Sequence, residues 1–220
     1  MKLITYADRD MMAIDLANVL AGELKAALFH ADWASFAVPG GSTPGPVFDD
    51  LCAATLDWDR VRVIPTDERL VPPDHDRSNE RLIRERLLVG AAAEAQFVGL
   101  RPGADGMEGL CSRVSRYLPL SVLVLGMGDD MHTASLFPGA QGLEAALEPD
   151  APPVIRIETP GAPEPRISLT APVLRGAMST HLVITGQEKR AALERAVELN
   201  DPRLAPVSAI LKNATIHWAE

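Results

Sequence analysis

The chain has only two cysteines, Cys52 and Cys111, which stand far apart and have neither metal-type nor redox-type spacing. This favours two buried, reduced thiols over a disulfide bridge. Thiols that stay reduced are typical of a reducing compartment, so we expect a cytoplasmic protein.

Long apolar runs and an excess of positive charge are also lacking. No uninterrupted apolar stretch approaches membrane-spanning length, and the first residues reach the charged Asp8 before an apolar core develops, unlike a signal peptide or anchor. The formal net charge is -9, whereas nucleic acids and anionic membranes attract clustered Lys and Arg. We expect neither partner. Individual Arg and Lys side chains in a local pocket would have to capture any anionic ligand.

What is present fits one globular domain covering residues 1–220. Hydrophobic residues make up 47% of the chain and charged residues 23%, a composition that supports a packed core. Short apolar runs rich in β-branched residues alternate with longer amphipathic segments. This alternation predicts βαβ units and an α/β fold with a mostly parallel sheet.

The expected elements follow from caps, periodicity and breakers. A first long helix is predicted over 8–29, because Asp8 can cap it and leucines recur at every fourth position from Leu16 to Leu28. The segment 149–165 holds six prolines and is predicted to be a surface excursion around one strand. Strands are predicted at 35–38, 61–65, 122–125, 154–157, 167–170, 181–185 and 215–218, and further helices after Pro44, after Ser78, at 107–117 and at 187–199.

Four unusual polar segments begin where a predicted strand ends. They cover residues 39–43, 66–69, 126–132 and 185–189. Loops that leave the carboxyl ends of parallel strands gather at one edge of the sheet, where ligands bind. We therefore expect the four segments to share one site.

The first segment contains Gly40, Gly41, Ser42 and Thr43, followed by Pro44. Paired glycines let the backbone approach a ligand closely, and Pro44 suits the first turn of a helix. Free amides at the helix start, with the two hydroxyls, would form a phosphate cradle. An ordinary strand-to-helix turn is an equal alternative for so short a string. A Walker loop is excluded because no Gly-Lys-Ser or Gly-Lys-Thr follows.

The second segment is the triplet Asp67, Glu68 and Arg69 after an apolar strand. The planar guanidinium of Arg69 suits phosphate or carboxylate, with Asp67 or Glu68 fixing its orientation. The following residues 74–76 are interpreted as a solvated loop before a helix capped by Ser78. A metal site there is a weak alternative, because no second ligand cluster is evident.

The third segment carries His132, two positions after Asp130. In a turn, Asp130 can accept the ring N–H, fix the tautomer and stabilise the imidazolium that forms when the ring takes a proton. Histidine suits general-base work at neutral pH. The glycines at 126 and 128 suggest a dinucleotide fold, but Met131 stands where the third glycine is required, so a nicotinamide site is not expected.

The fourth segment opens with Thr185 and Gly186 and carries Lys189 in the first turn of a predicted helix. A cation there opposes the helix dipole, which indicates an anion nearby. Arg166, at the start of another apolar run, is a further cationic candidate. A salt bridge at the rim explains Arg166 almost as well.

Taken in order, these strings resemble the 6-phosphogluconolactonase family, within the wider glucosamine-6-phosphate isomerase/deaminase-like superfamily. The resemblance covers nearly the whole chain. It implies a Rossmann-like, twisted sheet with helices on both faces, no cofactor and no required metal. It also implies hydrolysis of a small phosphorylated sugar lactone, 6-phospho-D-glucono-1,5-lactone, in the oxidative pentose phosphate pathway. The strings are 40–44, 67–69 with 71–72 and 78–79, the stretch ending at 134–138, 166–170, and 185–186 with Lys189.

The resemblance also assigns roles. His132 would be the general base, and Asp130 would support it. The predicted phosphate-binding and substrate-binding residues are Gly40, Gly41, Ser42, Thr43, Arg69, Arg166 and Lys189. The oligomeric state is not predicted.

One position departs from the family pattern, which reads Asp-Gly-His where this chain has Asp130-Met131-His132. If the family glycine adopts a left-handed conformation, methionine there costs on the order of 1–2 kcal/mol. If the glycine instead makes room for substrate, Met131 narrows the pocket or changes which lactone fits.

Two other functions are left as alternatives. An amino-sugar phosphate deaminase/isomerase shares the glycine-rich and glycine-aspartate-histidine strings. That group carries Asp-Glu-Tyr and Ala-Phe-Asn-Glu-Pro, whereas this chain has Asp67-Glu68-Arg69 and Ala134-Ser135-Leu136-Phe137-Pro138. A non-catalytic sugar-phosphate sensor is the second alternative, and Met131 is the only residue that suggests it.

Overall fold

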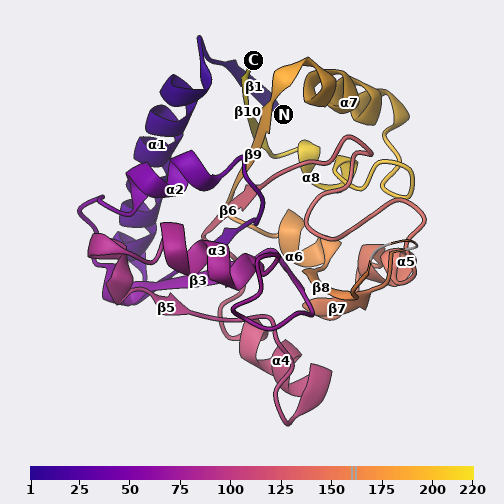
Figure 1. Ribbon diagram of the computed structural model, residues 1–220, viewed down its shortest axis with the longest axis horizontal. Coiled ribbons are helices and arrows are strands. Elements are labelled where there is room, and N and C mark those ends of the chain that lie inside the picture. Colours follow the sequence, from indigo (N-terminus) through magenta and orange to yellow (C-terminus); the bar gives the residue numbers. More distant parts are fainter. Residues whose placement is uncertain (160, 162) are drawn as a thin grey trace.

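The computed structural model describes residues 1–159, 161 and 163–220. Within them, a twisted seven-stranded sheet runs through the middle of the molecule in the order β1-β10-β9-β6-β2-β3-β5 (Figure 1). Every neighbouring pair in this sheet is parallel, as the alternation of short and long segments predicts. Its strands are β1 (Lys2–Thr5), β2 (Ala34–Val38), β3 (Val61–Pro65), β5 (Gln96–Phe97), β6 (Val122–Leu125), β9 (Ser179–Thr185) and β10 (Thr215–Ala219).

A second, smaller sheet lies beside the first. It is antiparallel, in the order β4-β8-β7, with β4 (Asp67–Arg69), β7 (Val154–Ile157) and β8 (Arg166–Leu169). The sequence predicted the strands β7 and β8 but not their separation into another sheet. It also treated the charged triplet as a loop, whereas the triplet forms β4 because it pairs with β8.

Helices cover both faces of the large sheet. Side chains alternate along each strand, so Phe36 and Val38 pack on one face and Ala37 on the other. The face with Phe36 is covered by α1 (Arg9–His30), α2 (Gly45–Leu51) and α3 (Asn79–Arg86). The opposite face is covered by α4 (Gly106–Ser115), α5 (Leu143–Leu147), α6 (Ala171–Arg175), α7 (Gly186–Leu199) and α8 (Ser208–Leu211). Short 3-10 turns occur at η1 (Trp58–Arg60) and η2 (Gly90–Glu94).

The first helix, α1, forms as its sequence predicts. The Asp8 carboxylate accepts a hydrogen bond from the Met11 amide at 2.7 Å and so satisfies one of the unpaired amides of the first turn. Leu16, Leu20 and Leu24 are fully buried against the sheet. Burial of that stripe stabilises α1 more than helix propensity does.

The proline-rich segment surrounds β7, which confirms the predicted excursion around one strand for its described part; Pro160 lies outside the described residues. Cys52 and Cys111 are both free, as expected, although each is half-buried rather than buried. Among the helices described, none is long and apolar enough to cross a membrane.

Candidate active site

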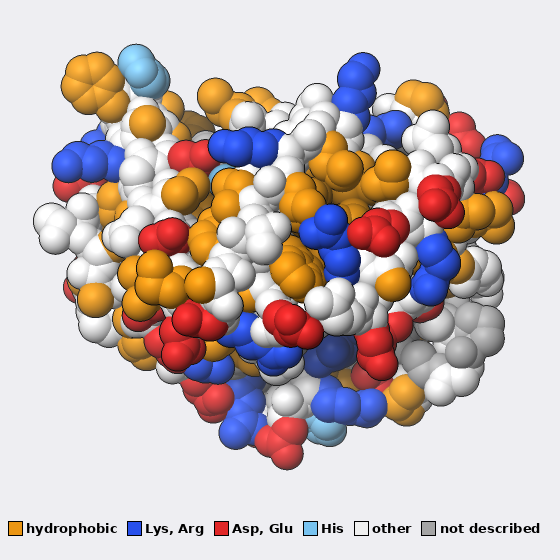
Figure 2. Space-filling model, turned by 90° about the horizontal axis from the view of Figure 1, so that it is seen from above, with side chains coloured by type: hydrophobic (Ala, Val, Ile, Leu, Met, Phe, Trp, Pro, Cys, Tyr) orange, Lys and Arg blue, Asp and Glu red, His pale blue; other side chains and the backbone are white. Residues whose placement is uncertain are grey.

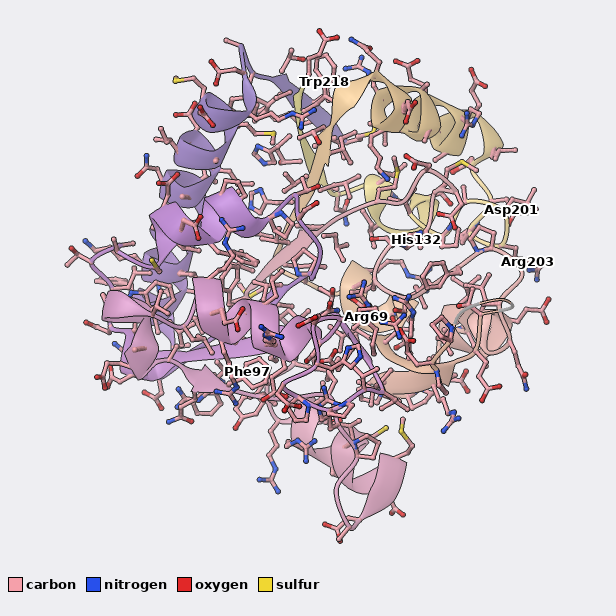
Figure 3. All side chains as sticks on the ribbon, in the orientation of Figure 1. Arg69, Phe97, His132, Asp201, Arg203 and Trp218 are labelled. Carbon is pink, nitrogen blue, oxygen red and sulfur yellow. The ribbon has the colours of Figure 1, made fainter. Side chains whose placement is uncertain are left out.

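The four polar segments converge on one cavity of about 320 Å³ at the carboxyl edge of the large sheet. Figure 3 labels two of its residues, Arg69 and His132, which approach it from different elements. The four segments therefore line one cavity, as expected. The cavity is lined by Pro39, Gly40, Gly41, Ser42, Thr43, Pro44, Asp67, Arg69, Asn79, Gly126, Met127, Gly128, His132, Ala134, Arg166, Val183, Ile184, Thr185 and Lys189.

The glycine-rich turn forms the wall between β2 and α2. Gly41 has φ +89°, a left-handed conformation that favours glycine. At Gly40, a Cβ atom would collide with the side-chain amide of Asn79. The amides of Gly41, Ser42 and Thr43 donate to no protein acceptor in the described part of the chain. They remain available to an anion, as the cradle interpretation requires.

Two arginines form another part of the wall. Arg69 on β4 and Arg166 on β8 are paired in the antiparallel register, and both line the cavity. Burial lowers the pKa of Arg166; the Asp67 carboxylate opposes this and the Arg69 charge reinforces it. In the region the structure describes, the buried Nε atoms of both arginines lack a partner. Two adjacent cations with unused donors favour an anion between them.

The orientation of Arg69 corrects the sequence-based expectation. Its Nη1 donates to the Arg77 carbonyl at 2.7 Å, and neither Asp67 nor Glu68 forms an ion pair with its guanidinium among the described residues. Arg166 likewise has no rim salt bridge within the described chain; its guanidinium lies over the Phe137 ring, 5.1 Å from the centroid. The rim alternative for Arg166 is therefore wrong.

Glu68 instead caps the following helix. Its carboxylate accepts hydrogen bonds from the amides of Asn79 and Glu80 at 2.9 and 2.8 Å and from the Ser78 hydroxyl at 3.2 Å. Ser78 also accepts from the Arg81 amide at 3.3 Å, which confirms the predicted N-cap. A carboxylate at the start of α3 suits the helix dipole and locks β4 to that helix.

The loop between β4 and α3 is a solvated surface loop, as predicted. His75 is exposed, and its Nδ1 accepts from the Arg77 amide at 3.1 Å. Asp76 is exposed and contacts the guanidinium of Arg81.

Sequence reasoning missed the roles of Asp67 and Asn79 in the cavity wall. The Asp67 carboxylate is buried and accepts from the hydroxyls of Ser135 at 2.6 Å and Thr66 at 3.1 Å. The side-chain amide of Asn79 donates to the Asp67 backbone carbonyl at 2.8 Å. The signals in the sequence were the position of Asp67 after a buried strand and the presence of both residues in the strings that resemble the family.

His132 and Asp130 form a hydrogen-bonded pair at the cavity. The Asp130 Oδ1 lies 2.5 Å from His132 Nδ1 and 3.2 Å from the His132 amide nitrogen. The hydrogen bond from His132 is the largest of the causes that lower the pKa of Asp130. With Nδ1–H donated to an ionised carboxylate, Nε2 carries the lone pair that can accept a proton.

The absence of a side chain at Gly128 allows His132 and Asp130 to pack against the backbone there. A Cβ atom at position 128 would collide with the imidazole of His132 and the carboxylate of Asp130. The Gly128 amide also donates to the His132 carbonyl at 2.9 Å, which closes the turn. On the other side, the Phe137 ring lies 4.1 Å from the His132 ring, centroid to centroid. Gly128, which resembled part of a dinucleotide motif, therefore leaves room for the His132 ring.

Lys189 lies in the first turn of α7, as predicted, and the anion beside it is Asp129. The Lys189 Nζ is 3.0 Å from the Asp129 carboxylate, and the Asp129 carbonyl accepts from Arg195 at 3.2 Å. This pairing ties α7 to the turn that carries His132.

Met131 has φ +66°, so its backbone adopts the left-handed conformation expected of the family glycine. Its side chain is half-buried and packs against the larger apolar core, and it does not line the cavity. The first of the two alternatives for Met131 is therefore correct.

Comparison with known families agrees with this geometry. The family model described as glucosamine-6-phosphate isomerases/6-phosphogluconolactonase matches residues 7–218. The chain belongs to this family. Nearly the whole length takes part, which confirms the resemblance seen in the separate strings.

Individual members of the family are similar over most of their length. A 6-phosphogluconolactonase from Rhizobium meliloti is 43% identical, with 97% of each chain covered. One from Pseudomonas aeruginosa is 41% identical over 92% of this chain and 88% of its own. The crystal structure of a 6-phosphogluconolactonase from Shewanella baltica superposes with a TM-score of 0.95 at 32% identity, covering 100% of this chain and 98% of that chain.

Proposed function

We propose that this chain, acting as one cytoplasmic domain of residues 1–220, is a 6-phosphogluconolactonase. It hydrolyses 6-phospho-D-glucono-1,5-lactone to 6-phosphogluconate, a step of the oxidative pentose phosphate pathway. The observation that carries the proposal is one cavity lined by three cationic side chains and by His132, whose ring is hydrogen-bonded to Asp130. The names of the similar proteins support the same reaction.

His132 acts as the general base in this scheme. Its Nε2 takes a proton from water while the water oxygen attacks the lactone carbonyl carbon, and Asp130 stabilises the imidazolium. The tetrahedral intermediate then collapses, the bond between the carbonyl carbon and the ring oxygen breaks, and the imidazolium returns its proton to that oxygen. A carboxylic acid and a hydroxyl result.

The remaining cavity residues hold the anionic groups. We assign the substrate phosphate to the turn of Gly40, Gly41, Ser42 and Thr43 together with Lys189, Arg69 and Arg166. Cationic side chains and preorganised amides also suit the oxyanion that develops at the carbonyl. Binding of the remote phosphate orients the carbonyl against the water, which converts binding energy into rate.

The face of the molecule seen from above offers no comparable site for a large polyanion among the described residues. Figure 2 shows acidic and basic side chains interspersed over the face seen from above, without a continuous basic stripe. The proposed partner is accordingly a small molecule and neither nucleic acid nor a membrane.

The deciding experiment is a lactonase assay on the purified chain. Freshly generated 6-phosphogluconolactone is supplied with a metal chelator present, and the spontaneous ring opening is subtracted. We expect enzyme-dependent acid release that the chelator leaves unchanged. Ammonia release from glucosamine 6-phosphate would instead support the deaminase alternative, and tight product binding without turnover would support the sensor.

A further inference from the structure

We infer that Met131 is a positioning residue, whose side chain anchors the turn that carries Asp130 and His132. The inference rests on the proposed function, because it concerns how the general base is held. It concerns a position where this chain departs from the Asp-Gly-His pattern.

The backbone around His132 is unusual. Among the described residues, the non-glycine positions with positive φ are Met131 at +66°, Ala134 at +49° and Asn200 at +45°. Asn200 is the left-handed C-cap of α7, a place where asparagine is common. The other two flank the catalytic histidine. Such conformations persist only where the surroundings over-determine them, and they cluster at functional sites.

Three separate contacts hold Met131 in this conformation. Its amide donates to the Gly128 carbonyl at 3.0 Å, and its carbonyl accepts from the Val207 amide at 3.1 Å, just before α8. Its side chain packs against the larger apolar core. Glycine would relieve the unfavourable backbone conformation and keep both hydrogen bonds, but it would lose the apolar contact and add backbone freedom.

That contact bears directly on the Asp130–His132 pair. Asp130 and His132 are the two neighbours of Met131, and the Asp130 carboxylate binds both the amide and the ring of His132. A rotation of the backbone at Met131 changes their relative position. Misplacement of a catalytic group by about 1 Å can lower the rate by roughly 100-fold.

Most of the groups assigned to the phosphate lie on other segments; Lys189 on α7 is the exception, because it pairs with Asp129 of this turn at 3.0 Å. Gly41 belongs to the turn before α2, and Arg69 and Arg166 lie on β4 and β8. Loosening the turn at Met131 therefore alters the chemical step more than the capture of substrate. This separation predicts a loss in kcat with little change in KM.

Three substitutions of Met131 distinguish the effect of its apolar side chain from the effect of its backbone conformation. Met131→Gly and Met131→Asn both suit a left-handed backbone but remove the apolar anchor, whereas Met131→Leu keeps an apolar side chain and the same backbone difficulty. We expect kcat on 6-phosphogluconolactone to fall roughly tenfold in Met131→Gly and in Met131→Asn, with KM within about twofold of the original value. Met131→Leu should retain most of the original kcat.

The matched control is Met178→Asn, at an exposed methionine, which should leave both kinetic constants unchanged. Circular dichroism and thermal unfolding of each variant establish that the assayed enzyme is folded. Rates of Met131→Gly and Met131→Asn equal to or above the original, or a Met131→Leu rate as low as theirs, would overturn the inference. A wild-type chain without lactonase activity would overturn the proposed function instead.

Discussion

Two groups of histidines in this protein occupy opposite environments. The His132 side chain is 29% exposed, contacts Asp130 through one nitrogen and faces the cavity. His181 and His217 are buried in β9 and β10, and their rings are hydrogen-bonded to each other at 3.0 Å. The difference is one of position along a parallel strand. The first histidine follows the carboxyl end of β6, whereas the other two lie inside strands.

The buried pair uses every ring nitrogen. His217 Nδ1 lies 2.8 Å from the Tyr6 hydroxyl, and His181 Nε2 lies 2.8 Å from the Glu23 carboxylate. With Glu23 ionised and both rings neutral, each donor in this chain has one acceptor: Tyr6 to His217, His217 to His181, and His181 to Glu23. The comparison teaches that a histidine needs an unoccupied nitrogen as well as an acidic partner to act as a base.

The largest effect is expected from substitution of His132, the partly exposed histidine. His132→Asn removes the nitrogen that we propose accepts the proton, so kcat should fall by roughly 10²–10⁴. The unfolding midpoint should stay close to that of the parent, because His132 is partly exposed. Steady-state kinetics and denaturant unfolding measure the two quantities. Near-normal turnover would remove His132 from its role as base.

The second prediction concerns the buried histidines and the dependence of the protein's stability on pH. Burial lowers the pKa of His217 to about 4 from 6.5, so the folded state binds fewer protons than the unfolded state between these values. Stability from this group is therefore fully present above pH 6.5 and is lost as the pH falls towards 4, on the order of 3 kcal/mol. The pKa of Glu23 is lowered in spite of its burial, because His181 donates a hydrogen bond to it. The contribution of ionised Glu23 to the free energy of unfolding is therefore also lost in acid.

Urea unfolding at a series of pH values from 7.5 to 4 measures this loss. His217→Asn is the paired variant and should be less stable at pH 7.5, with a shallower dependence on pH. The same slope in both proteins would mean that His217 does not carry the acid sensitivity.

A smaller effect is expected at Lys189, a cationic residue that lines the cavity. Lys189→Ala removes a cation assigned to the phosphate, so KM for the phosphorylated lactone should rise roughly 10- to 100-fold. The matching substrate is unphosphorylated gluconolactone, for which the change should be slight. Equal losses on both substrates would contradict contact between Lys189 and phosphate.

The smallest effect lies outside both groups of histidines. Asp8→Ala removes the N-cap of α1, the helix that carries Glu23, and should lower the free energy of unfolding by about 1 kcal/mol. The kcat should not change. A change in kcat without a change in stability would link α1 to the cavity by a route that its contacts do not suggest.

Much of the fold was predictable because local signals agreed with it. The strands β3, β6 and β7 have the predicted bounds, because each is a short run rich in β-branched residues that polar residues, glycine or proline bound. The site followed from one topological rule, that loops after parallel strands meet at one edge. His132, Arg69 and Lys189 were singled out in this way, and all three line the cavity.

The rest depended on contacts between distant parts of the chain. Asp67–Arg69 carries no apolar pattern and becomes β4 only through its partner Arg166–Leu169. Glu68 looked like a partner for Arg69 but caps α3 instead. The pairing of His181 with His217 requires the register of β9 against β10, which no local pattern encodes.

The order of strands in the large sheet has a consequence for biosynthesis. β1 pairs only with β10 in that sheet, Lys2 beside Thr215, and β10 in turn completes the edge of β9. The ribosome therefore synthesises β1 long before its partner β10. The sheet cannot be completed until β10 has emerged. A nascent chain stalled before residue 215 would keep one side of β9 open for aggregation or for a chaperone.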